Sequence, residues 1–163
     1  MTESEFRKLL DAAEKSPREI AAAVSGLPEK VLKYKPAPAK WSILEILAHL
    51  VDMETLYAYR MRQIVADKTP VLAPIDQDDW ARNLGYMDEN PAELVALYGL
   101  NRHHNVGLLR RLKAVDLDKT AMHPELNKQV PLWDYVQKMG VHGPNHLKQI
   151  EQLKREATKT KSA

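Results

Sequence analysis

Two histidines four residues apart are the sequence feature with the clearest chemical potential. They are His142 and His146, at the ends of the run His-Gly-Pro-Asn-His. Four residues of helix turn the chain through about 400° and advance it by about 6 Å, so both imidazoles can reach one metal ion. No glutamate follows the first histidine, so the pattern differs from the H-E-x-x-H motif of metalloproteases. Alone, the pair is a weak signal, because surface or core histidines can share this spacing.

A third histidine, His49, strengthens the metal hypothesis. It lies between Ile46 and Met53 on the apolar face of a segment with helical period. Taken alone, His49 is interpreted as a core side chain satisfied by one hydrogen bond, or as a side chain at the edge of the apolar face. Helices in contact lie about 8–10 Å apart, a gap that two imidazoles can bridge, and burying three titratable groups without a partner is costly. We therefore predict a divalent metal site formed by His49, His142 and His146.

The other histidines give weaker signals. His103 and His104 are adjacent and project about 100° apart on a helix, so we expect them on a solvated face. His123 precedes Pro124 in an irregular stretch, where it could reach over a site or be a plain turn residue. The sequence contains no nucleophile elbow, P-loop or dinucleotide-binding glycine motif. We assign no catalytic residue and expect no organic cofactor.

Four segments with the 3.6-residue period of a helix must position the metal site. Their approximate bounds are 2–25, 42–66, 90–113 and 131–156. Apolar residues in them recur at the spacing of one helix face. Ser42 and Glu45 have the spacing of a capping box, and Asn90 followed by Pro91 is typical of a helix start. The sequence therefore predicts an all-α protein with a four-helix bundle.

Prolines are expected to interrupt two of these helices. Ser4 is the candidate N-cap of the first, and Pro17 is expected to start a second segment within it. Pro144 removes the helical hydrogen bond to the carbonyl oxygen of Gly140. We therefore expect a kink or a break in the last helix, which would aim His142 towards the metal.

Two long connectors, 67–90 and 114–130, have no clear period. Connectors longer than about 12–15 residues are often functional. We predict that at least one of Trp80, Tyr86 and His123 lines a mostly apolar pocket beside the metal. In the alternative, these segments only cover the core, and Trp80 is a hydrophobic plug.

The length, net charge and cysteine content of the chain limit the classes of protein to which it can belong. The chain has 163 residues, a net charge of +2 and no cysteine. This length fits one domain, which we place at 1–156, with a flexible tail at 157–163. The balanced charge argues against a nucleic-acid partner. The lack of cysteine excludes disulfides, thiolate metal sites and cysteine nucleophiles.

The sequence predicts a cytoplasmic protein without a membrane partner. Residues 1–6 lack the features of a secretory signal. The most apolar stretch, 43–51, falls far short of the roughly 20 residues of a membrane span. The basic residues around Arg60 and Arg62, and those in 110–113, are expected on a solvated surface, with the binding of an anionic substrate or partner as the alternative.

The sequence resembles the DinB-like superfamily, which includes the YfiT-like metal-dependent hydrolases. The resemblance rests on residues 41–50, Trp-Ser-Ile-Leu-Glu-Ile-Leu-Ala-His-Leu, and residues 142–150, His-Gly-Pro-Asn-His-Leu-Lys-Gln-Ile. Leu-Asn-Arg at 100–102 and His-Pro at 123–124 also look like the family pattern. The likeness spans roughly residues 6–154. One difference is Gly143, since an acidic residue often follows the first histidine of the pair in the family.

The resemblance implies a four-helix bundle, often dimeric, with zinc or nickel held by His49, His142 and His146. Family members of known activity include transferases and isomerases that use low-molecular-weight thiols. We therefore expect a homodimeric metal-dependent hydrolase or thiol-dependent transferase with an unassigned small-molecule substrate. Because the chain has no cysteine, any thiol must be an external cosubstrate.

The alternative from another class is a non-catalytic metal-binding protein of the stress response. Groups around the metal would distinguish the two, because catalytic sites orient their histidines through carboxylates or carbonyls. The nearest candidates for this role by sequence are Glu45, Asp52 and Glu54.

Overall fold

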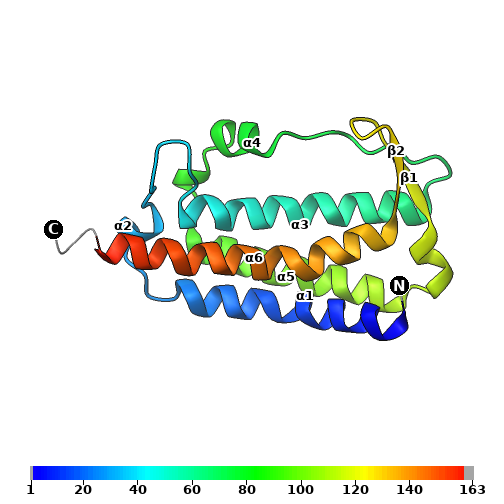
Figure 1. The fold of residues 1–163 in the computed structure, drawn as a ribbon, viewed down its shortest axis with the longest axis horizontal. Coiled ribbons are helices and arrows are strands. Elements are labelled where there is room, and N and C mark those ends of the chain that lie inside the picture. The colour runs from blue at the N-terminus through cyan, green and yellow to red at the C-terminus, as the bar shows by residue number, and fades with distance from the viewer. Residues whose placement is uncertain (1, 160–163) are drawn as a thin grey trace.

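The computed structural model describes residues 2–159 and contains the predicted four-helix bundle (Figure 1). The long helices are α1 (Glu3–Val24), α3 (Ile43–Ala66), α5 (Pro91–Arg111) and α6 (Leu132–Lys159). Shorter elements lie between them: α2 (Glu29–Leu32), α4 (Gln77–Asn83), the 3-10 helices η1 (Tyr86–Asp88) and η2 (Ala114–Asp118), and the antiparallel strands β1 (Thr120–His123) and β2 (Lys128–Pro131).

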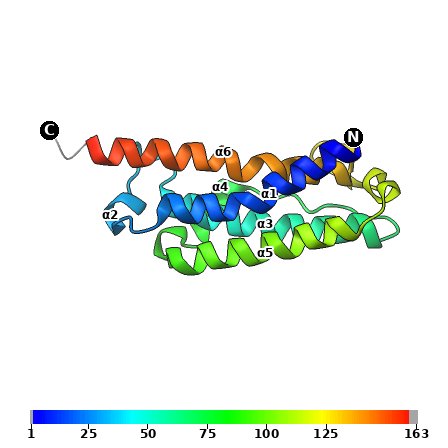
Figure 2. The same ribbon diagram turned by 90° about the horizontal axis from the view of Figure 1, so that it is seen from below.

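The helices α3 and α5 run in one direction, and α1 and α6 run in the other (Figures 1 and 2). Each long helix packs against two others, in the cyclic order α1, α5, α3, α6. Because α3 and α5 are parallel, the connector 67–90 returns along the length of the bundle, and it carries α4 with it. The hairpin of β1 and β2 lies at the end of the bundle where α3 ends and α6 begins.

Local sequence signals explain where the helices begin. The Ser42 hydroxyl accepts from the backbone N–H of Glu45, whose carboxylate accepts from the backbone N–H of Ser42. This capping box and the cap formed by Asn90 confirm the predicted starts of α3 and α5. The prediction for α1 is wrong, because Thr2 rather than Ser4 is its N-cap.

Neither internal proline divides its helix. Helix α1 is continuous through Pro17, and α6 is continuous through Pro144. The predicted second segment at Pro17 and the predicted break at Pro144 are therefore wrong. A proline inside a helix costs about 3 kcal/mol, and the packing of both helices along the bundle outweighs that cost. A bend at Pro144 without a break stays a prediction.

The segments that follow α5 and α6 also differ from expectation. The stretch 114–130 was expected to be irregular, but it holds η2 and most of a β-hairpin. Helix α6 continues to Lys159, past the predicted domain boundary, and residues 160–163 of the predicted tail lie outside the described residues. Within residues 2–159, no helix has the length and apolar character needed to cross a membrane.

The buried side chain of Arg102 on α5 links all four long helices. Its Nε donates to Glu54 Oε2 on α3 at 2.7 Å, and its Nη1 donates to the carbonyl oxygens of Met139 on α6 at 2.7 Å and Ala13 on α1 at 3.3 Å. Asn105 donates to the second oxygen of Glu54 at 2.9 Å. Removing one partner of such a buried pair typically costs about 3–5 kcal/mol. The network therefore fixes the relative positions of α3 and α6.

Two glycines let α6 approach α1 closely. A Cβ atom at Gly143 would lie 2.6 Å from Ser16 Cβ and 2.8 Å from the Tyr98 hydroxyl oxygen, and one at Gly140 would lie 2.7 Å from Leu9 Cδ2. Real Cβ atoms do not tolerate such distances in a packed core. Since Gly143 follows His142 directly, this contact also sets the position of the histidine pair.

We expect Gly143→Ala to destabilise the protein by about 1–3 kcal/mol, because the added methyl overpacks the contact with Ser16 and Tyr98. Gly99→Ala is the matched control inside α5, where a Cβ would meet nothing closer than Pro17 Cβ at 3.9 Å. The control should stabilise by about 0.5–1 kcal/mol through helix propensity. Urea denaturation measures both changes, and equal effects of the two substitutions would contradict the packing argument.

Candidate metal centre

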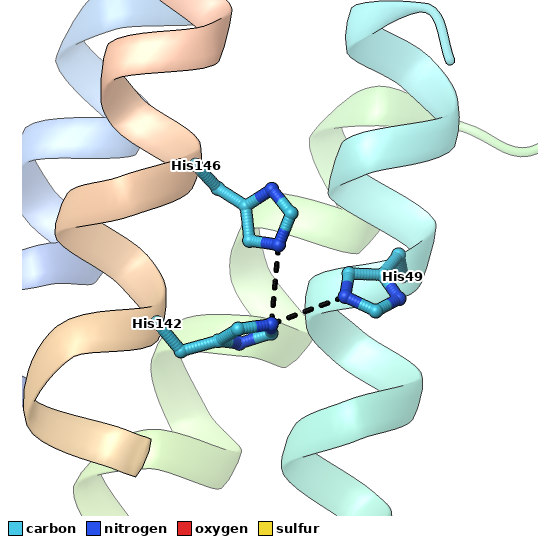
Figure 3. A group of neighbouring side chains, drawn as sticks. All are labelled: His49, His142 and His146. Carbon is cyan, nitrogen blue, oxygen red and sulfur yellow. Dashed lines mark hydrogen bonds between the residues drawn. The ribbon is translucent and has the colours of Figure 1, made fainter. Parts of the chain in front are cut away.

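The structure brings the three predicted histidines together. His49 comes from α3, and His142 and His146 come from the face of α6 that packs against it (Figure 3). The Nε2 atom of His142 lies 3.1 Å from the Nε2 atom of His49 and 3.1 Å from that of His146. One nitrogen from each ring lies within 4.8 Å of the other two. The spacing of the pair on α6 and the contact with α3 place these nitrogens around one point.

Hydrogen bonding among the three rings does not account for this arrangement. A neutral imidazole nitrogen offers either one proton or one lone pair, so Nε2 of His142 cannot pair well with two neighbours at once. Two ligand nitrogens in tetrahedral zinc coordination lie about 3.3–3.4 Å apart, given Zn–N distances of about 2.0–2.1 Å. The observed separations are close to that value. A divalent cation therefore fits the donor set better than a proton does.

Burial keeps the three rings neutral, which is the form that binds metals. It lowers the pKa of His49 to about 3, and repulsion from His146 adds to the shift. Burial also lowers the pKa of His142 to about 2, with contributions from His146, His49 and Arg102. The pKa of His146 is lowered by burial, against the opposing effect of its hydrogen bond to Gln149.

Gln149 orients one of the rings. Its Oε1 lies 2.7 Å from Nδ1 of His146. Because an amide oxygen only accepts, the proton lies on Nδ1 and the lone pair of Nε2 faces the other two histidines. Gln149 is not among the site residues predicted from the sequence. Its position three residues after His146 on the same helix face was the available signal.

The carboxylates expected to orient the histidines have other partners. Glu45 caps α3 and pairs with Lys35 at 2.7 Å. Asp52 accepts a hydrogen bond from the Tyr86 hydroxyl. Glu54 pairs with Arg102 in the buried network described above. No hydrogen bond joins any of the three to a site histidine within residues 2–159, so the prediction for these carboxylates is wrong.

Aromatic rings form part of the surroundings of the histidines. The ring centroid of Trp41 lies 4.7 Å from that of His49. The ring centroid of Tyr57 lies 5.9 Å from that of His142. Such contacts limit the rotation of each imidazole and lower the local dielectric constant. The site is therefore largely preorganised.

A pocket of about 710 Å³ opens beside the three histidines, which form part of its wall. The connector 36–41 contributes Lys40 and Trp41, and α4 contributes Gln77 and Asp78. The C-terminal half of α6 supplies further polar side chains, including Gln152. The pocket thus combines apolar residues, such as Ile46 and Leu153, with polar groups of both charge signs.

The residues predicted to line this pocket do not do so. Trp80 packs against the hydrophobic core, because α4 turns it inward and leaves Asp78 facing the pocket. Tyr86 is buried against α3. His123 is buried in β1, at the other end of the bundle. The connector 67–90 does form part of the wall, but through other residues.

The predicted exposure to solvent is confirmed for two histidines of α5 and contradicted for an arginine of α3. His103 and His104 are exposed on α5, as expected. Arg60 is only 6% exposed, so its predicted place on a solvated surface is wrong. Arg62 is half-buried and donates to the Asn105 side chain at 3.2 Å.

Metal-free protein should lose stability as the pH falls from 7 to 5.5. The unfolded chain binds protons at its histidines below about pH 6.5, whereas the folded state holds His49 and His142 neutral. The loss approaches about 1.4 kcal/mol per pH unit for each such histidine. Urea denaturation in the presence of a chelator measures it. The slope should be shallower in His142→Ala and unchanged in His104→Ala, and equal slopes in all three proteins would contradict the prediction.

Comparison with known proteins agrees with this architecture. A protein of Bacillus mycoides strain KBAB4, named a "putative metal-dependent hydrolase", is 27% identical over 154 residues, which is 94% of this chain and 88% of that protein. One from Oceanobacillus iheyensis with the same description is 24% identical and covers 88% of this chain and 83% of its own length.

The structure of YfiT from Bacillus subtilis superposes with a TM-score of 0.90 at 20% identity, over 96% of this chain and 89% of YfiT. YfiT is described as "a probable metal-dependent hydrolase with an unusual four-helix bundle topology". At this identity the likeness shows the fold. The sequence itself matches the DinB superfamily over residues 12–150. The chain therefore belongs to the DinB superfamily.

Proposed function

We propose that this protein is a metal-dependent hydrolase that holds one divalent ion through His49, His142 and His146. The observation that carries the proposal is the convergence of three neutral imidazole nitrogens, two of them 3.1 Å from the third, at the wall of a pocket. The names of the relatives support the same reaction class.

Three protein ligands leave coordination positions open, as in catalytic rather than structural zinc sites. When bound, such an ion supplies Lewis acidity and lowers the pKa of water or of a thiol at those positions. Gln149 fixes the tautomer of His146, and Trp41 packs against His49. Burial of the three rings keeps protons from competing for their nitrogens near neutral pH.

The pocket favours a small-molecule substrate with both apolar and polar parts. Its volume of about 710 Å³ lies within the range of about 300–1,000 Å³ of small-molecule sites. At its wall, Lys40 offers a positive charge, and Asp78 and Glu156 offer negative charges. Zinc and nickel are the proposed metals, because imidazole ligands suit both and availability decides between them.

Two features bear on the choice between hydrolysis, thiol-dependent transfer and metal binding without catalysis. A thiol-dependent transferase would need an external thiol, since the chain has no cysteine. A non-catalytic metal-binding protein would need no pocket beside the metal, so the pocket supports the enzymatic proposal. Homodimer formation, a cytoplasmic location and a role in the stress response stay predictions.

His142→Ala should abolish metal binding, because Nε2 of His142 is the nitrogen nearest to both of the others. We expect about one divalent ion per wild-type chain and none in the variant, measured by elemental mass spectrometry on protein purified without an affinity tag. His104→Ala, which changes an exposed histidine on α5, should keep the metal. Unchanged metal content in His142→Ala would contradict the proposed ligand set.

Gln149→Leu should weaken the metal affinity by about 10–100-fold without changing the stoichiometry, because His146 loses the partner that fixes its tautomer. Gln152→Leu is the matched control, since Gln152 lines the same pocket but donates to Glu156 instead. Competition with a chelator measures both affinities. Equal affinities for the two variants would show that Gln149 has no orienting role.

The reaction itself is tested with a panel of small esters and amides, with and without added zinc or nickel. Hydrolysis should depend on the metal and should be absent in His142→Ala. Turnover that appears only when a low-molecular-weight thiol is added would replace the hydrolase proposal with the transferase one. Metal binding without turnover of any panel member, with or without thiol, would favour the non-catalytic alternative.

A further inference from the structure

A second group of polar side chains lies between α3 and α6, away from the histidine site. Arg60 comes from α3, Tyr135 and Lys138 from α6, and His123 from β1. Arg60 lies 11 positions after His49, or about 16 Å along the helix axis. The buried ring of Tyr57 lies between the two regions, with its centroid 5.7 Å from that of Tyr135.

Among the residues that the structure describes, three buried polar atoms in this group have no hydrogen-bond partner. They are Nε of Arg60, Nδ1 of His123 and the hydroxyl of Tyr135. The three residues are at most 9% exposed. Leaving a buried polar group unpaired is costly, so three such atoms in one place favour the binding of a polar ligand or of ordered water between them.

The charge of the group defines the kind of ligand. Arg60 donates to the carbonyl oxygen of Ala73 but makes no ion pair with any carboxylate in residues 2–159. Burial lowers the pKa of His123, the charge of Arg60 adds to that shift and Glu125 opposes it. Burial raises the pKa of Tyr135, whereas the Arg60 guanidinium, through its charge and its proximity to the hydroxyl, opposes that rise. The region therefore holds a buried cation whose charge no nearby carboxylate directly offsets.

Two lysines extend the positive region to solvent. Lys138 lies over the ring of Tyr135, with its Nζ 4.9 Å from the ring centroid. Lys138 and Lys128 are both exposed, and neither forms an ion pair within the described chain. Asp134 acts on Lys138 electrostatically without pairing with it. The two lysines thus add positive charge beside the buried donors, which attracts an anion to this part of the surface.

We propose that Arg60, His123, Tyr135 and Lys138 form a binding site for the oxyanion group of a small metabolite, a phosphate or a carboxylate. Arginine suits this role because its planar guanidinium donates to two oxygens of one anion. The hydroxyl of Tyr135 and a protonated nitrogen of His123 supply further donors. The proposal does not depend on the metal centre.

The test is a titration of the full-length protein with inorganic phosphate, and separately with acetate, at constant ionic strength. Amide NMR signals report the binding site and the dissociation constant. We expect saturable shifts in 57–63 and 120–138, with a preference that identifies phosphate or carboxylate as the group. Tyr135→Phe, which removes only the unpaired hydroxyl, and Arg60→Lys should each weaken binding at least tenfold. Tyr59→Phe, on the exposed side of α3, should leave it unchanged.

The His142→Ala variant distinguishes anion binding at the proposed site from anion binding at the metal centre. Saturable binding that persists in His142→Ala supports the proposal whatever the fate of the hydrolase function. Shifts confined to the three histidines and lost in that variant would overturn it, because the anion would then bind at the metal. Shifts that do not saturate, or equal affinities for wild type and Tyr135→Phe, would also overturn it.

Discussion

The pairing of Arg102 with Glu54 is the interaction on which the arrangement of the bundle depends. A metal site tolerates ligand displacements of only a few tenths of an ångström, yet its ligands here come from two different helices. Glu54 lies five residues after His49 on α3, and Met139, the acceptor of a second bond from Arg102, lies three residues before His142 on α6. One guanidinium therefore sets the positions of both helices close to their histidines. Apolar packing alone would allow them to slide.

The sequence predicts those parts of the fold that depend on interactions between residues close together in the chain. Helix starts at Ser42 and Asn90 depend on hydrogen bonds within one turn, and the apolar period reports which face is buried. The predicted interruptions at Pro17 and Pro144 are wrong because tertiary packing outweighs the low intrinsic preference of proline for a helix interior. The hairpin of β1 and β2 could not be predicted because each strand has only four residues. In addition, β1 pairs with a segment distant in sequence, since the N–H of Leu72 donates to the carbonyl oxygen of Met122.

The same distinction holds for the candidate site: local spacing predicts its histidines, whereas its other walls depend on tertiary structure. The spacing of His142 and His146 fixes their common face, and the wide apolar stripe of α3 places His49 inside the bundle. The walls of the pocket could not be predicted, because they depend on the paths of connectors that carry no periodic signal. The burial of Arg60 could have been foreseen. It lies three residues after Tyr57 and four before Ile64, both of which are buried on α3.

The parallel contact of α1 with α6 has a consequence for how the protein is made. Helix α1 is synthesised before the other three long helices, but its most extensive partner, α6, follows both α3 and α5. The apolar face of α1, including Leu10, Ala13 and Ile20, must therefore wait until α3 and α5 have been synthesised before α6 can cover it. The nascent chain is exposed to aggregation during that interval. The bundle is consequently complete only after α6 has been synthesised, and the three histidines meet only at that point.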